Sequence, residues 1–268
     1  MSSGELQREG QKPIVVKIGG GPLGEGDTLY QDLVSLQRDG QRVVVVHGGG
    51  NVVSRWQEIH GIEARFVRGL RVTDLPSLEV ATAVLAGLVN KGLVASLQAE
   101  GGNAVGLSGV DGGILEARVV SPELGHVGRI ATVHRGLLEA LLREGYIPVV
   151  APIAARGASN KQKGEGLLNV NADTVAAEVA AALKAHRLIY LTDVPGVRDG
   201  AGGSIPYLSI EETQRLIETG VITEGMIPKV EGCLRAARAS VPACILDGRE
   251  PHALLEAVAG GGIGTRFD

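Results

Sequence analysis

The strongest constraint on the fold of this chain is a unit that occurs twice near its start: a short apolar strand, a glycine-rich loop and a helix. PIVVKI at 13–18 is followed by a glycine run at 19–26, and RVVVV at 42–46 is followed by HGGG at 47–50. Both strands are β-branched and almost continuously apolar, which is typical of strands buried on both faces of a parallel sheet. The repeat predicts an α/β fold in which helices cover both faces of a mostly parallel central sheet.

The rest of the chain continues this alternation. FVRGLRVT at 66–73 predicts a hairpin, Asp27 is the expected N-cap of a helix at 28–39, and Ser209 with Glu212 predicts a capping box. Further strands are predicted at 103–109, 114–120, 126–133, 146–153, 187–193 and 243–248. Further helices are predicted at 51–60, 75–100, 134–144, 171–184, 209–220, from 228 onward, and at 250–258.

The helix predicted at 75–100 is apolar over most of its circumference. Leu78, Leu85 and Val89 share one face, and Val80 and Val84 widen it. A helix of this kind is covered on both sides. The pattern fits a central core helix and a subunit interface equally well.

Composition excludes several classes of protein. With 26 Lys and Arg against 30 Asp and Glu, the net charge of -4 lacks the basic excess of a nucleic-acid-binding protein. The apolar stretch at 147–155 is interrupted by prolines and is far shorter than the roughly 20 residues of a membrane-spanning helix. Two cysteines make no disulfide framework, and the N-terminus has no apolar signal-peptide core. We therefore expect a cytoplasmic protein that binds neither nucleic acid nor membrane.

Common catalytic motifs are absent. The chain has no GxxxxGK[ST] phosphate loop, no HExxH metal motif and no GxSxG nucleophile turn. Gly19, Gly21 and Gly24 do form GxGxxG after a strand. The acidic residue of a dinucleotide site, however, ends the second strand, whereas Asp39 precedes that strand here. This misplacement disfavours a dehydrogenase.

A phosphate site explains the same loop better. The N–H groups of Gly19 and Gly20 can approach a phosphate because no Cβ blocks them, and the helix that follows adds positive potential. Lys17 is a single charge on an apolar strand, two residues before the loop. Taken alone, Lys17 could be an edge residue reaching water, and the loop at 47–50 an ordinary strand–helix turn. Together, they favour a polyanionic ligand.

Seven segments in this order resemble the signature segments of the amino acid kinase family. They are VVKIGG (15–20), VVHGGG (45–50), GLRVTD (69–74), GLSGVDGG (106–113), LNVNAD (168–173), LTDVPGV (191–197) and GMIPKV (225–230). The resemblance covers about residues 13–266 and implies a three-layer αβα sandwich around a mostly parallel sheet. It also implies an acyl-substrate lobe at 13–170 and an ATP lobe at 171–268. Residues 1–12 are polar apart from Leu6 and are expected to form a disordered tail.

The activity implied by the resemblance is ATP-dependent phosphorylation of the γ-carboxylate of N-acetyl-L-glutamate in arginine biosynthesis. A carboxylate with a pKa of about 4.3 is already ionised at neutral pH, so it needs no general base. Catalysis would then consist of positioning and charge stabilisation. Lys17 and Lys229 resemble the family's phosphoryl-stabilising lysines, and Asp173 resembles the residue that holds both. The resemblance implies Mg²⁺ bound through the ATP phosphates rather than by a carboxylate cluster of the protein.

The resemblance also assigns binding residues. Arg71 would grip the α-carboxylate of the substrate, Asn169 its α-carboxylate or acetamido end, and Gly49 and Gly50 would line its pocket. Gly20 and Gly49 would donate N–H groups to the moving phosphoryl group. The remaining nucleotide and phosphate residues implied are Gly19, Asp193, Gly196, Val197, Arg198, Gly225 and Met226.

Two departures from the family pattern bear on assembly. Arginine-inhibited members of the family look to carry a longer N-terminal helix and a bulkier C-terminal tail than this chain has. We therefore expect a homodimer through the 75–100 helix and no feedback inhibition by arginine. Two alternative functions are a carrier-protein-linked aminoadipate or glutamate kinase and a non-catalytic nucleotide-binding sensor. The resemblance leaves open a docking site for a nitrogen-sensing regulatory protein.

Overall fold

The computed structural model describes residues 11–19, 28–67, 69–157, 166–223, 225–262 and 264–267. Most of the predicted tail and the predicted cap Asp27 lie outside these ranges. Within them, helix α2 (Leu29–Arg38) has Thr28 at its N-cap position.

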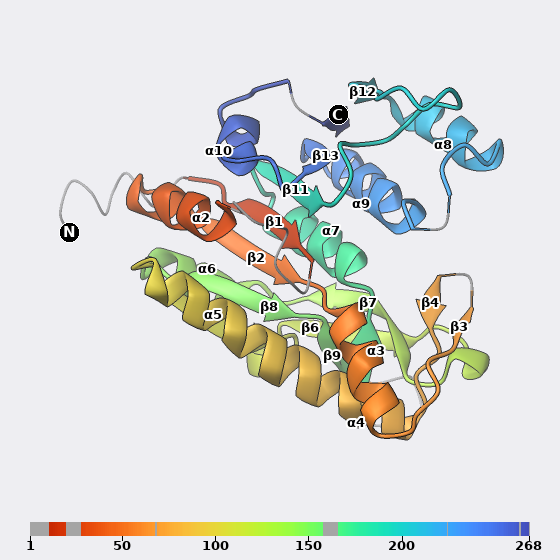
Figure 1. Cartoon of the computed structure of the whole chain (residues 1–268). Coiled ribbons are helices and arrows are strands. Elements are labelled where there is room, and N and C mark those ends of the chain that lie inside the picture. The colour runs from red at the N-terminus through yellow and green to blue at the C-terminus, as the bar shows by residue number, and fades with distance from the viewer. Residues whose placement is uncertain are drawn as a thin grey trace.

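Eight strands form the central sheet, which runs through the whole molecule (Figure 1). Across the sheet they lie in the order β12 (Tyr207–Leu208), β14 (Thr265–Phe267), β13 (Ala243–Asp247), β11 (Arg187–Thr192), β1 (Ile14–Ile18), β2 (Val43–His47), β8 (Ile147–Ala151) and β5 (Ala104–Ser108). Only β13 and β14 pair antiparallel. The mostly parallel sheet predicted from the sequence is confirmed, whereas β12 and β14 were not predicted.

The strands at the centre of the sheet are buried on both faces, as their apolar sequences predict. All five residues of β1 and all five of β2 are buried. In register, Lys17 of β1 lies between Val46 of β2 and Tyr190 of β11. The carboxyl ends of three parallel strands therefore meet at one edge of the sheet, beside Lys17.

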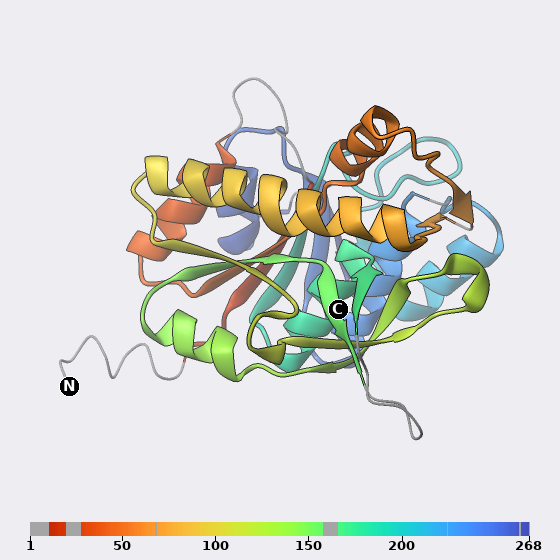
Figure 2. The ribbon, with the colours of Figure 1, turned by 90° about the horizontal axis from the view of Figure 1, so that it is seen from below.

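Helices cover both faces of the sheet (Figure 2). On one face, α6 (Gly136–Arg143), α7 (Ala172–Ala182) and α9 (Ile227–Arg238) share a hydrophobic core, with α8 (Ile210–Glu218) beside α9. On the other face, a second core joins α2, α3 (Gly50–Ile59), the helix that follows Asp74, and α10 (Ala253–Val258). This arrangement confirms the three-layer αβα sandwich.

The long helix predicted at 75–100 is present as three continuous segments. They are α4 (Leu75–Thr82), a π-helical stretch at Ala83–Val89 and α5 (Asn90–Ala99). Leu85, Leu93 and Leu97 point into the core, while Leu88 is 51 % exposed. Among the described residues, Leu75–Ala99 is the single helix long and apolar enough to cross a membrane by length and composition, a test that core helices of soluble proteins also pass.

Four short strands close into a small barrel beside the central sheet. They are β6 (Leu115–Val119), β7 (Val127–Val133), β9 (Ile153–Arg156) and β10 (Leu167–Val170). Short 3₁₀ turns at Asp111–Gly113 and Pro122–Leu124 precede β6 and β7. The sequence predicts β6 and β7, but neither β9 and β10 nor the closure of the barrel. The predicted hairpin is present as β3 (Phe66–Val67) and β4 (Leu70–Arg71).

Candidate active site

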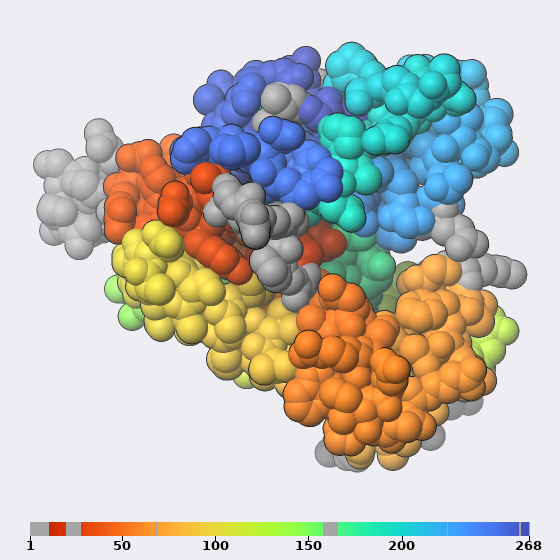
Figure 3. All heavy atoms as spheres, viewed as in Figure 1, coloured from red at the N-terminus to blue at the C-terminus, as the bar shows by residue number. Residues whose placement is uncertain are grey.

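A cavity of about 490 Å³ opens at the edge of the sheet where β1, β2 and β11 end. Figure 3 shows that the surface is hollowed here. The hollow lies between two parts: the orange segment, which carries α3 and the hairpin, and the blue segments of the C-terminal part. The lining includes Lys17, Asp173 and Lys229, together with residues of the glycine loop after β2. Cavities outside the carboxyl ends of parallel strands are the usual ligand sites of α/β sheets.

Three charged side chains, predicted from distant parts of the sequence, meet in this cavity. Lys17 Nζ lies 2.8 Å from Asp173 Oδ1, and Lys229 Nζ lies 3.3 Å from Asp173 Oδ2. The side chain of Asp173 is 8 % exposed, that of Lys17 10 % and that of Lys229 20 %. One carboxylate thus holds two ammonium groups on its two oxygens, leaving a net positive charge on the cavity wall.

Local structure keeps Asp173 ionised and in place. Asn171 caps α7 by accepting hydrogen bonds from the N–H groups of Asp173 and Thr174, so Asp173 lies in the first helical turn. Burial raises the pKa of Asp173, but the charges of Lys17 and Lys229 outweigh burial and hold that pKa below its usual range. The hydroxyl of Tyr190 donates to the backbone oxygen of Asp173 at 2.8 Å and ties the helix start to β11.

The glycine loop after β2 forms the opposite wall. Gly48, Gly49 and Gly50 all line the cavity, and Gly49 is the N-cap residue of α3. Gly49 has φ +145°, and a Cβ there would lie 2.9 Å from Leu85 Cδ2. Only glycine suits this position, because both the backbone angle and the packing exclude a side chain. Gly19 also lines the cavity, whereas the predicted phosphate donor Gly20 lies outside the described residues.

Arg71 reaches the cavity from β4 and is held by α3. Its Nη2 donates to Gly50 O and Ser54 Oγ, both at 2.8 Å, and its Nη1 donates to Gln57 Oε1 at 2.5 Å. The Phe66 ring packs on the guanidinium, 4.6 Å from its carbon to the ring centroid. These contacts do not exhaust the N–H donors of a guanidinium, so Arg71 can also bind a carboxylate.

Asn169 lines the same part of the cavity from β10. Its Nδ2 donates to Thr73 Oγ1 at 3.3 Å, and the Thr73 hydroxyl donates to Arg71 O at 3.0 Å. Thr73 is fully buried and therefore links the two predicted substrate-binding residues. The contacts of the Asn169 side chain use its Nδ2, so Asn169 Oδ1 can accept a hydrogen bond from a ligand.

The predicted nucleotide residues divide into two groups. Asp193 lines the cavity, and Gly225 lies next to it, since its carbonyl accepts from Lys229 Nζ at 3.2 Å. Gly196, Val197, Arg198 and Met226 are not among the described residues that line it. Gly196 packs closely on Thr265, because a Cβ added at Gly196 would lie 2.6 Å from Thr265 Oγ1. Gly196 therefore has a packing role as well. A nucleotide role for these four residues remains a prediction.

Several residues that shape the site were missed in the sequence. Gln57, Thr73 and Tyr190 are completely buried polar residues that hold Arg71, Asn169 and Asp173. Their only signal in the sequence is a polar or amphipathic residue at an apolar position. Among the described residues, no group of three or more His, Cys, Asp or Glu side chains is placed to hold a metal ion.

Comparisons with known proteins agree with this geometry. Residues 12–247 match the amino acid kinase family. The acetylglutamate kinase of Dehalococcoides mccartyi strain 195 is 41 % identical over 252 residues, covering 94 % of this chain and 93 % of the relative. The acetylglutamate kinase of Methylobacterium nodulans is 45 % identical over 278 residues, covering 97 % of this chain and 90 % of the relative.

Solved structures share the fold. The smu.665 protein of Streptococcus mutans superposes with a TM-score of 0.82 at 28 % identity, over 95 % of this chain and 97 % of that one. An N-acetylglutamate synthase of Neisseria gonorrhoeae, in complex with coenzyme A and N-acetyl-glutamate, superposes with a TM-score of 0.82 at 28 % identity. That match covers 98 % of this chain and 61 % of the synthase. A carbamate kinase of Giardia lamblia, 14 % identical with a TM-score of 0.69, shares the fold alone over 96 % of this chain and 98 % of its own.

Proposed function

The chain belongs to the amino acid kinase family, and from this premise we propose that it phosphorylates the γ-carboxylate of N-acetyl-L-glutamate with ATP. The product is N-acetyl-L-glutamyl 5-phosphate, an intermediate of arginine biosynthesis. Relatives named acetylglutamate kinase at 40–45 % identity over nearly the full chain support this substrate. The observation that carries the proposal is the pair of lysines held on one buried carboxylate at the cavity wall.

The geometry suits transfer of a phosphoryl group to a carboxylate. The nucleophile is already ionised at neutral pH, so the protein has to align it and stabilise negative charge on the moving phosphoryl group. Lys17 lies beside the glycine loop and Lys229 at the start of α9, and both ammonium groups border the cavity. Asp173 holds both in a fixed geometry before substrate arrives, so little reorganisation is needed in the transition state.

Substrate recognition is assigned to the part of the cavity next to the hairpin. We assign the α-carboxylate to Arg71, whose guanidinium is pre-positioned by Gln57 and Ser54. Asn169 is oriented by Thr73 so that its Oδ1 accepts from the substrate's amide N–H. Gly49 and Gly50 let the backbone approach the acyl chain. A guanidinium and an amide acceptor together select an N-acylated amino acid over a simple dicarboxylate.

ATP enters from the opposite side, where Asp193 and Lys229 line the cavity. The excess of positive charge in the described lining suits a nucleotide that brings its own Mg²⁺, and Asp193 would be the lining carboxylate, outside the Asp173 cluster, that could help to hold that ion. Magnesium would bind through the ATP phosphates and would neutralise part of their charge. Accordingly, we assign residues 13–170 to the acyl substrate and 171–268 to the nucleotide, with the Lys17–Asp173 pair at their junction.

A homodimer completes the proposal. The long helix buries one side against the central sheet and exposes apolar residues such as Leu88 on the other. A second copy of this helix is the natural cover for that face, and we place the enzyme in the cytoplasm as a biosynthetic enzyme. Size-exclusion chromatography with light scattering, comparing wild type with Leu88→Glu, tests the dimer. A wild-type monomer would contradict it.

Substrate choice is tested by ADP release in the presence of Mg-ATP. We compare N-acetyl-L-glutamate, free L-glutamate and N-acetyl-α-aminoadipate, with Asp173→Asn as the control of strongly reduced activity. Turnover on N-acetyl-L-glutamate alone is the expected result. No turnover on any of the three, with ATP still bound, would contradict the proposed function and favour a carrier-linked substrate or a nucleotide sensor.

A further inference from the structure

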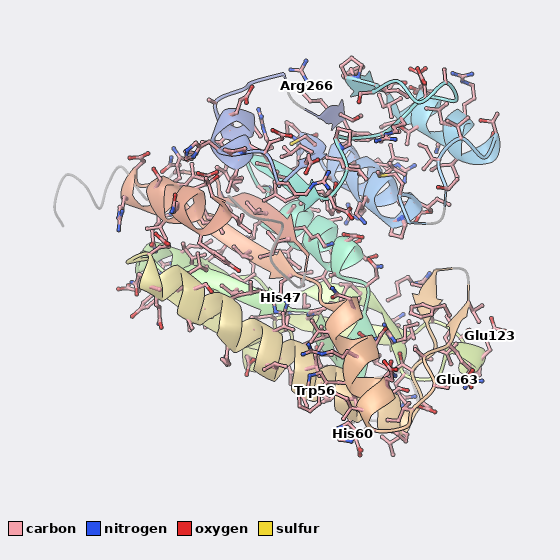
Figure 4. The ribbon with its side chains drawn as sticks, in the orientation of Figure 1. His47, Trp56, His60, Glu63, Glu123 and Arg266 are labelled. Carbon is pink, nitrogen blue, oxygen red and sulfur yellow. The ribbon has the colours of Figure 1, made fainter. Side chains whose placement is uncertain are left out.

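His47 ends β2 and directly precedes the glycine loop at 48–50. Its side chain is 0 % exposed, and Figure 4 shows it in the interior of the molecule, away from the rim residues Glu63 and Glu123. It is not among the described residues that line the cavity, so it does not touch a ligand there. A buried imidazole at this place can act on the site only through the backbone of the loop.

The contacts of the ring determine which of its nitrogens carries the proton. His47 Nδ1 lies 2.8 Å from Gly48 O, and since a carbonyl oxygen only accepts, Nδ1 carries the hydrogen. His47 Nε2 lies 3.1 Å from Asn90 Nδ2, an amide donor, so Nε2 is unprotonated. Burial lowers the pKa of His47 to about 4, which agrees with the neutral ring that these contacts require.

Asn90 has no freedom to reverse its amide. It is 0 % exposed, and its Nδ2 also donates to Val149 O at 2.9 Å on the neighbouring strand β8. On the other side of the amide, Oδ1 accepts from Lys91 Nζ at 3.1 Å. The amide nitrogen is therefore directed at His47, and the histidine tautomer follows from it.

The peptide between Gly48 and Gly49 links the orientation of the His47 ring to the cavity. A planar trans peptide directs its carbonyl and its N–H in opposite directions. Gly48 O points at His47, and the Gly48 N–H donates to Ile18 O at 2.9 Å, so both sides of Gly48 are held. The Gly49 N–H consequently points away from His47. Gly49 itself lines the cavity, and no described group accepts a hydrogen bond from its N–H.

We propose that Asn90 is a positioning residue for phosphoryl transfer: it fixes His47 in the Nδ1–H tautomer, which holds the Gly48 carbonyl so that the Gly49 N–H faces the transferring phosphoryl group. The proposal rests on the proposed kinase function. Without Asn90, His47 can carry its proton on Nε2, and its bare Nδ1 then repels the Gly48 carbonyl. The peptide rotates, and the site loses a donor that stabilises developing negative charge.

The kinetic test is Asn90→Leu, which keeps the size of the side chain and removes its polar atoms. We expect kcat to fall by roughly 10–100-fold, less than the loss of a direct donor, while KM for both substrates stays within about threefold. Leu97→Ala, a core truncation two turns along the same helix, is the matched control for destabilisation and should keep its kcat. A folded Asn90→Leu enzyme with wild-type kcat would overturn the proposal.

A second pair of variants covers the case in which Asn90→Leu does not fold. In His47→Asn, the amide nitrogen occupies the place of Nδ1 and can still donate to Gly48 O, whereas His47→Leu cannot. We expect His47→Asn to keep kcat within about fivefold of wild type and to exceed His47→Leu by about tenfold or more. Equal losses in the two variants would overturn the proposal.

Ring-nitrogen NMR of histidine-labelled protein tests the tautomer without any turnover. The wild type should show His47 protonated on Nδ1, and Asn90→Leu should lose this state. An unchanged Nδ1–H signal in Asn90→Leu would overturn the proposal. A wild-type chain that turns over none of the substrates would instead contradict the proposed function, and the NMR result would still decide the role of Asn90.

Discussion

Lys17 Nζ and Asp173 Oδ1 lie 2.8 Å apart, although the first residue is on strand β1 and the second starts helix α7 after the barrel. The pair closes the cavity at the junction between the two halves of the chain. Because Asp173 also binds Lys229, the three side chains form one electrostatic unit. We therefore expect substitutions within it to be strongly non-additive in their effect on kcat.

Asp173→Asn tests that unit. The neutral amide cannot hold two ammonium groups, so the lysines repel one another and move away from the phosphoryl group. We expect kcat to fall by roughly 10²–10³-fold, the size of losing a preorganised charge-stabilising contact. Steady-state ADP release measures it, with circular dichroism to check the fold. An Asp173→Asn enzyme within about threefold of wild-type kcat would remove Asp173 from the mechanism.

Asp173 also predicts the acid limit of stability. The lysines hold its pKa in the folded state below the unfolded value, so it stabilises the fold above about pH 4 and this contribution is lost as pH falls through the lowered pKa. In urea unfolding, the wild type should therefore lose stability relative to Asp173→Asn as pH falls below about 4. Curves that stay parallel throughout the acid range would contradict the ion pair.

Gln57→Glu tests how the substrate carboxylate is recognised. Gln57 is fully buried and its oxygen accepts from Arg71, so a carboxylate of the same shape competes with the substrate for the guanidinium. We expect KM for N-acetyl-L-glutamate to rise by about tenfold or more, with KM for ATP little changed. Arg71→Ala should show the same selectivity. A parallel rise in KM for ATP would indicate general disruption.

Gly232→Ala tests the support beneath Asp173. A Cβ at Gly232 on α9 would clash with Tyr190 Oη, whose hydroxyl donates to Asp173 O. Either the tyrosine or the helix has to move, which costs about 1–3 kcal/mol of the free energy of unfolding and lowers kcat. Gly136→Ala, which has no described neighbour within 4 Å, is the control and should be neutral or slightly stabilising. Equal stability of the two variants would contradict this packing.

His47 predicts a second pH dependence. Burial lowers its pKa in the folded protein from 6.5 to about 4. Between these pH values the unfolded chain binds the proton and the folded protein does not, so stability falls as pH drops from 6.5 to 4, by about 3 kcal/mol in total. In His47→Asn this contribution is absent, and its unfolding free energy should fall less over the same range. Identical slopes would show that His47 is not buried neutral.

Much of the central sheet could be predicted because its strands carry their own signal. The runs of β1 and β2 are mostly β-branched and are followed by glycine, the centre of β11 is continuously apolar, and all three strands are fully or almost fully buried. The barrel strands lack this signal. β10 has only four residues, and β6 and β7 carry exposed charged side chains, so their closure depends on tertiary pairing that local pattern does not encode. β12 and β14 are too short to stand out.

The residues of the site also differ in how far the sequence could predict them. Lys17 was conspicuous as a charge in an apolar strand, and the glycines as positions where the backbone has to approach a ligand. Gln57 and Thr73 were not recognised, and Asn90 matched the family pattern without a role being assigned to it, because each acts by holding another residue across the fold. Packing determines the partners of these residues. The sequence does not distinguish a buried amide or hydroxyl from an exposed one.

Trapping of the product with hydroxylamine tests the central claim most directly. An acyl phosphate reacts with hydroxylamine to give a hydroxamate, so the enzyme with Mg-ATP and N-acetyl-L-glutamate should form hydroxamate in step with ADP. The Asp173→Asn enzyme should form both products in step, at rates lower by roughly 10²–10³-fold. ADP release without hydroxamate, or hydroxamate from free L-glutamate at an equal rate, would contradict phosphorylation of the γ-carboxylate of N-acetyl-L-glutamate as the function of this protein.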